Sequence, residues 1–168
     1  MRRLTVAVIL ATFLPLVAVA ALPPDEAPAA PVHVQFRFAS PEPVPDWEAF
    51  ELGGVPYFLE PAVLLDESHF ALASARRGRG EVWHVEVILT EEGARLLGEI
   101  TTANLERRIG MVVDGKLLSA PVIKAPITQG RALISGNIDE YEARRIAAGV
   151  MAPHEMVTDE PAQEPPAE

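Results

Sequence analysis

Residues 82–150 contain the stretch that decides the fold, VWHVEVILTEEGARLLGEITTANLERRIGMVVDGKLLSAPVIKAPITQGRALISGNIDEYEARRIAAGV. Within 82–89, every second side chain from Trp83 onward is apolar, which predicts a β-strand with one buried face. Thr90 then caps a helix, because it precedes two acids and an apolar stripe at helical spacing. Asn104 falls inside that stripe, where its amide needs a partner, and we expect it to tie the helix end to the next strand.

A hairpin follows the helix. Asp114 and Gly115 lie between two apolar runs, 109–113 and 116–123, and this dipeptide favours a two-residue type I′ turn. Pro121 lies inside the second run, and proline cannot donate to a strand ladder. We therefore expect the second strand to lie at a sheet edge or to end in a bulge.

The remaining elements complete an α+β pattern. Residues 132–134 predict a short strand, and Asp139 with Glu142 resembles the capping box that begins a helix. Upstream, 55–59 predicts a strand, while 66–75 fits either a short helix or an extended run. This order predicts a two-layer α+β sandwich, with a mostly antiparallel sheet and two main helices on one face.

The N-terminus predicts export. A basic start at Arg2 and Arg3 precedes an apolar run, and the segment 1–20 closes on a small-residue site typical of signal peptidase. We expect cleavage between Ala20 and Ala21, which would make the mature chain periplasmic or secreted. The alternative is an uncleaved segment that anchors the chain to the cytoplasmic membrane, the one membrane contact that the sequence predicts.

Composition divides the rest of the chain. Residues 21–46 contain seven prolines and predict an extended tether, in which 32–38 alternates and could form an edge strand. Residues 47–152 form the predicted folding unit. Residues 153–168 are acidic, rich in proline and without Lys or Arg, which predicts a disordered tail.

Charge and composition exclude several functions. The formal net charge of −10 argues against nucleic acid as a partner, because such binding needs a basic surface. The chain has no Cys, which excludes disulfides, Cys-ligated zinc and a thiol nucleophile. The one basic cluster, residues 76–80, is typical of a solvated loop, although it could bind an anionic partner.

Sites for chemistry are sparse in this sequence. His84 and Glu86 share one strand face and could together touch a cation, but a polar sheet face explains them equally. Neither Ser119 nor Ser135 lies in the Gly-x-Ser-x-Gly motif that exposes a nucleophile. We therefore expect no catalytic residue, no metal ligand and no cofactor.

The segment from Leu89 to Val150 resembles the head subdomain of the first periplasmic domain of SecD/SecDF, the accessory membrane subunit of the Sec translocon. The matching pieces, in order, are Thr90-Glu91-Glu92-Gly93-Ala94, Thr101 to Asn104, Asp114-Gly115-Lys116, Ser119-Ala120-Pro121, Ile134-Ser135-Gly136 and Glu142-Ala143. We assign structural roles within this motif to Thr90, Asn104, Asp114, Gly115, Pro121, Gly136 and Asp139.

The resemblance implies a ferredoxin-like module outside the cytoplasmic membrane that engages emerging preproteins. The family's membrane bundle and base portion have no counterpart in these residues, so we expect a stand-alone, secreted copy of the head. Its expected partners are unfolded or secreted polypeptides and components of the Sec translocon.

An edge strand can bind an extended peptide, and the candidate residues are Ser119, Val122 and Lys124. Two alternatives remain open. One is a cell-envelope structural or interaction domain with no Sec role, and the other is a small-molecule or ion-binding domain around His84 and Glu86.

Overall fold

The structure is a computed structural model that describes residues 29–152. The predicted signal segment 1–20, with its cleavage site between Ala20 and Ala21, and the predicted tail 153–168 lie outside the described residues. Within 29–152, every helix is too short or too polar to cross a membrane.

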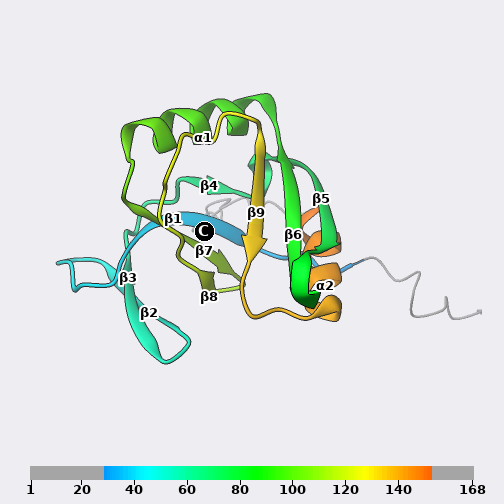
Figure 1. The fold of residues 1–168 in the computed structure, drawn as a ribbon, viewed down its shortest axis with the longest axis horizontal. Coiled ribbons are helices and arrows are strands. Elements are labelled where there is room, and N and C mark those ends of the chain that lie inside the picture. Colours follow the sequence, from blue (N-terminus) through cyan, green and yellow to red (C-terminus); the bar gives the residue numbers. More distant parts are fainter. Residues whose placement is uncertain (1–28, 153–168) are drawn as a thin grey trace, which may run out of the picture.

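The strands form two antiparallel sheets (Figure 1). The first sheet has the order β2-β3-β1-β7-β8, with β4 also pairing with β1. Its strands are β1 (Val34–Ser40), β2 (Glu48–Leu52), β3 (Val55–Leu59), β4 (Leu65–Asp66), β7 (Arg108–Val113) and β8 (Lys116–Ser119). The second sheet has the order β5-β6-β9, with strands β5 (Phe70–Arg77), β6 (Trp83–Leu89) and β9 (Arg131–Ser135).

Two α-helices cover different parts of this framework. Helix α1 (Glu91–Ala103) crosses one end of the two sheets, and α2 (Glu140–Val150) packs on β5 and β6 (Figure 1). Two short 3-10 helices, η1 (Glu67–His69) and η2 (Arg79–Glu81), flank β5. The ambiguous segment 66–75 thus contains a 3-10 turn and the start of a strand.

The predicted α+β class is confirmed, but the single sheet of a ferredoxin-like sandwich, with both helices on one face, is wrong. The cause lies in the connection 120–130, which leaves β8 and crosses to the other sheet. There the Leu89 amide donates to the Gly130 carbonyl at 2.9 Å, which sets β9 beside β6. The first sheet meanwhile curls toward a barrel, because β2 approaches β8.

The predicted tether 21–46 also needs correction, because it contains β1. This strand lies between β3 and β7, so its predicted edge position is wrong, and Phe36 and Phe38 belong to the main core. The folded part therefore begins well before residue 47. The alternation of 32–38 had indicated a strand there, but the prolines on both sides of it favoured an extended tether over a place in the folded unit.

The buried side chains form two cores. The main core lies between the sheets and α2, and its fully buried members include Val34, Phe36, Val85, Val87, Ile134 and Ile146. A second, smaller cluster lies in the curl of the first sheet and consists of Ala39, Leu59, Val112, Leu117 and Ala120. The two cores lie on opposite faces of β1 and β7, so side chains on both faces of these two strands are packed.

A candidate binding groove

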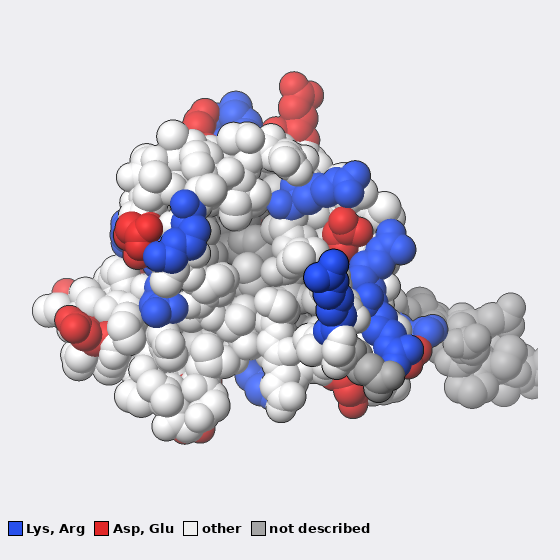
Figure 2. Space-filling view, viewed as in Figure 1, with Lys and Arg blue, Asp and Glu red and all other residues white. Residues whose placement is uncertain are grey.

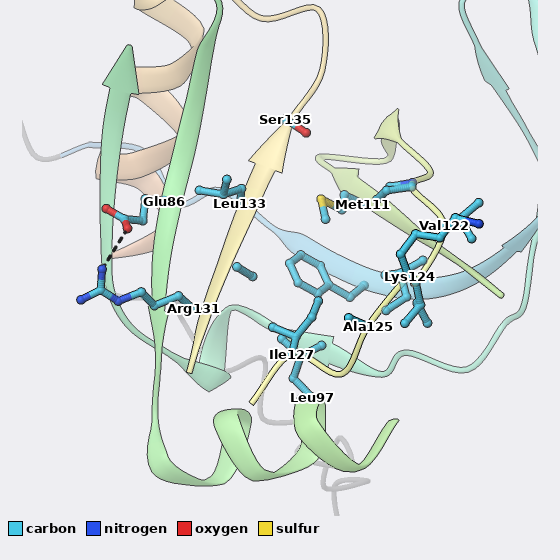
Figure 3. Close-up of a pocket in the computed structure, with 15 residues that line it drawn as sticks. Glu86, Leu97, Met111, Val122, Lys124, Ala125, Ile127, Arg131, Leu133 and Ser135 are labelled. Carbon is cyan, nitrogen blue, oxygen red and sulfur yellow. Dashed lines mark hydrogen bonds and ion pairs between the residues drawn. The ribbon is translucent and has the colours of Figure 1, made fainter. Parts of the chain in front are cut away.

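An apolar groove opens between β9 and the segment 120–125 that follows β8 (Figure 3). Its volume is about 590 Å³. The apolar side chains at its base come from both sheets and α1 and are those of Phe36, Leu97, Ile109, Met111 and Ala132. A groove of this size and polarity accommodates several side chains of a ligand.

One wall of the groove is the outer edge of β9. The bond from Leu89 to Gly130 fixes the phase of the antiparallel ladder, in which alternate residues pair directly. Arg131, Leu133 and Ser135 therefore direct their main-chain N–H and C=O groups away from β6. Within residues 29–152, β9 has no strand on that side.

The opposite wall is the segment predicted from sequence as a peptide-binding edge. The Pro121 carbonyl accepts from Ile109 N at 3.0 Å, and Ile123 N donates to the Arg107 carbonyl at 2.8 Å. These bonds flank an isolated bridge at Val122, whose own N–H and C=O groups consequently face away from β7. The groove thus lies between the edge of β9 and a segment that pairs with β7 through an isolated bridge at Val122.

The three residues proposed for that edge separate in the structure. Val122 and Lys124 line the groove. Ser119 does not line it; it is the last residue of β8 and pairs with Met111. Its Oγ is buried and has no hydrogen-bond partner in the described part of the chain. The part of the predicted edge that faces the groove therefore excludes Ser119.

Helix α1 holds this wall in place through Thr101, which is fully buried. Its Oγ1 accepts from Ile127 N at 2.9 Å and donates to the Leu97 carbonyl at 2.6 Å. At the other end of the wall, the Arg108 guanidinium donates to the Ala120 carbonyl at 2.8 Å. Thr101 begins one of the pieces that resemble the family, but neither of these contacts with the wall was predicted from the sequence.

Charged side chains stand around the mouth of the groove. Figure 2 shows Lys and Arg on both sides of the central hollow. On the β9 side, Glu86 accepts from Arg131 at 3.4 Å and from Arg76 at 3.3 Å, and on the other side Lys124 pairs with Glu106 at 2.7 Å. The cations outnumber the acids at this mouth, although the whole chain is acidic.

The arrangement around His84 and Glu86 does not favour the cation site that the sequence suggested there. Two arginines already neutralise the Glu86 carboxylate, one of them Arg76 from the basic cluster 76–80. Among residues 29–152, three or more His, Asp or Glu side chains nowhere gather as metal ligands would.

Several motif residues begin or end the two α-helices. Thr90 is the N-cap of α1, accepting from Gly93 N at 3.1 Å, and Asp139 is the N-cap of α2, accepting from Glu142 N at 2.8 Å. Asn104 is the C-cap of α1, where its amide donates to the Ile100 carbonyl and accepts from Arg107, one residue before β7.

Asp114 does more than turn the hairpin at Gly115. Its carboxylate accepts from His33 N at 3.0 Å and from Arg145 at 2.9 Å, so it joins the residue before β1, the β7–β8 turn and α2. Arg145 also donates two bonds to Glu142, and these bonds hold the pKa of that carboxyl below its ordinary value. The sequence showed the turn but not this network.

Two motif residues shape the approach to the groove. At Gly136, a Cβ would lie 2.6 Å from the Leu118 carbonyl, so only glycine fits where the chain leaving β9 passes β8. Pro121 lines the groove and offers its carbonyl to β7. The outer edge of β9 was missed, and its one sequence signal is Leu133, an apolar residue on an otherwise polar strand face.

These features define a small α+β domain with an open apolar groove between the edge of β9 and the segment 120–125. The sequence model of the family described as SecDF, P1 head subdomain, matches residues 44–152, and the chain belongs to this family. The resemblance drawn from the sequence is therefore confirmed, as is the connection of the family with protein transport.

Individual relatives agree with this assignment. The protein translocase subunit SecD of Treponema pallidum is 44% identical over 77 residues, which are 46% of this chain and 13% of that protein. SecD of Acetobacter pasteurianus is 31% identical over 117 residues, 70% of this chain and 22% of that protein. The chain thus spans less than a quarter of either relative.

A solved structure shares the fold. It is that of the membrane component SecDF, which enhances protein export, and it superposes with a TM-score of 0.59 at 24% identity. The superposition covers 73% of this chain and 63% of that one. This likeness concerns the fold alone.

Proposed function

We propose that this domain is a non-enzymatic, polypeptide-binding head that assists Sec-dependent export outside the cytoplasmic membrane. The observation that carries the proposal is the apolar groove between β9 and 120–125 in a chain of the SecDF P1 head family. Its partners would be unfolded secretory polypeptides, together with components of the translocon to which its relatives belong by name.

The chemistry of the groove supports such a substrate. An unfolded chain exposes apolar side chains that a folded one hides, and the groove presents mainly apolar atoms to receive them. Burying one large apolar side chain is worth about 1.5–3 kcal/mol. Two or three such side chains, less the cost of ordering the chain, give weak and reversible binding. Weak binding suits a chain that must be released.

Site-specific photocrosslinking tests the proposal. A photoreactive residue at Val122, on the groove wall, should label an unfolded secretory preprotein. The control position is Tyr141 on α2, which is highly exposed and away from the groove. Labelling from Val122 that is no stronger than labelling from Tyr141 would refute the assignment of this groove.

A matched pair of charge substitutions adds a binding measurement. Leu133→Asp places a carboxylate at the groove, whereas Leu72→Asp places one on β5, and both leucines are 49% exposed. The probe is a short fluorescein-labelled peptide in which valine alternates with serine. We expect Leu133→Asp alone to weaken its binding, because only that carboxylate desolvates against the bound peptide.

A further inference from the structure

We infer that the polypeptide in the groove binds as an added β-strand on the outer edge of β9. This inference rests on the proposed function and specifies how the groove holds its ligand. The added strand would make main-chain hydrogen bonds to Arg131, Leu133 and Ser135 and extend the second sheet from three strands to four.

The edge of β9 has the geometry for this pairing. All three of these residues line the groove, and their outward N–H and C=O groups recur at every second position. An extended chain presents its own groups with the same spacing, about 6.6–6.8 Å. Main-chain bonds do not depend on the ligand's side chains, which would let one groove accept many sequences.

The groove selects one extended chain over the edge of a second folded copy. The segment 120–125 stands opposite β9, so an occupant of this space has a wall on each side (Figure 3). An extended chain is a single strand wide, whereas the edge of a folded sheet carries its neighbouring strands and loops with it. Only the single chain can lie along β9 without displacing this wall.

Charge further specifies the occupant. Arg131 on one side and Lys124 on the other bring cations to the mouth, and each already pairs with an exposed or half-buried acid. Carboxylates beside the apolar residues of a bound chain can replace Glu86 and Glu106 as partners. We therefore expect acidic flanks to strengthen binding and basic flanks to weaken it, with a dependence on salt.

The decisive test uses N-methylated peptides and the full chain. In the alternating valine–serine probe, N-methylation of every valine removes the donors along one edge, and N-methylation of every serine removes those along the other. A strand added to β9 uses one edge only. We expect one pattern to weaken binding roughly tenfold or more, and the other to keep affinity within about threefold.

Three results would overturn the inference, and the first two separate it from the proposed function. If both patterns bind like the unmodified peptide while Leu133→Asp still weakens binding, the groove binds polypeptide but not as a strand. If the unmodified peptide does not bind at all, the proposed function fails as well. Probe-independent association of the chain with itself would indicate a second copy at the edge instead.

A substitution in the protein provides an independent measurement. Leu133→Pro removes an N–H that points away from β6, a position at which an edge strand tolerates proline. Leu133→Ala is the control, because it removes the apolar side chain and keeps that N–H. We expect the proline variant to bind the probe several-fold more weakly than the alanine variant. Equal binding by two folded variants would contradict strand addition, and the N-methylated peptides decide the matter if the proline variant does not fold.

Discussion

Replacing Thr101 with valine should loosen the groove wall. The substitution keeps the shape of a fully buried side chain but deletes the oxygen that accepts from Ile127 N. Ile127 is half-buried, and its N–H has no other hydrogen bond within residues 29–152. A donor that is shielded from water and left unsatisfied costs about 1–3 kcal/mol. Because valine leaves almost no cavity, we expect the free energy of unfolding to fall by about 2 kcal/mol.

The matched control is Thr102→Val in the next residue. Thr102 is exposed, and its hydroxyl bonds only within the helix, to the Gly98 carbonyl at 2.6 Å. We expect this variant to stay within about 0.5 kcal/mol of the wild type. Urea denaturation gives both values, and amide exchange at Ile127 should accelerate in the Thr101 variant alone. Equal stabilities for the two variants would refute the role given to Thr101.

Two further substitutions test how α2 is held. Gly149→Ala should lower the free energy of unfolding by about 1–3 kcal/mol, because the added Cβ would lie 2.3 Å from Val32 Cγ2. The control is Gly98→Ala in α1, where the added Cβ meets ordinary contacts and should raise the free energy of unfolding by up to about 1 kcal/mol. Equal urea midpoints for the two variants would contradict this difference. Arg145→Met should cost more stability at neutral pH than in acid. The pKa of Glu142 is lower in the folded state than in the unfolded state. The stabilisation by its ion pair with Arg145 is therefore present above the unfolded pKa and is lost as the pH falls through the folded pKa. A loss of stability in Arg145→Met that does not change with pH would count against this ion pair.

Local sequence signals predicted the elements between residues 82 and 150 well, because each depends on neighbouring residues. Alternation indicated β6, helical spacing with Thr90 indicated α1, and Asp114 with Gly115 indicated the hairpin turn. Each of these patterns acts over a few residues, so chain context hardly alters it. They also sufficed to reveal the family.

These local signals could not predict which strands pair when the strands are distant in the sequence. The strand β1 was mistaken for part of a tether, because the prolines around it outweighed its alternation. Its central place depends on β3 and β7, which are distant in the sequence. The crossing of 120–130 to the other sheet depends on Thr101 and Gly130, and no local pattern announces either contact.

By itself, then, the sequence determined the α+β class, the helix caps, the hairpin and the membership of the SecDF head family. Only the tertiary structure decided that the strands form two sheets and that a groove separates β9 from the segment 120–125. The physical reason is that caps and turns are satisfied by neighbouring residues. This groove depends on contacts between residues distant in the sequence, those of Ile127 with Thr101 and of Gly130 with Leu89, which position the segment 120–125 and β9 and leave the outer edge of β9 without a partner strand within residues 29–152.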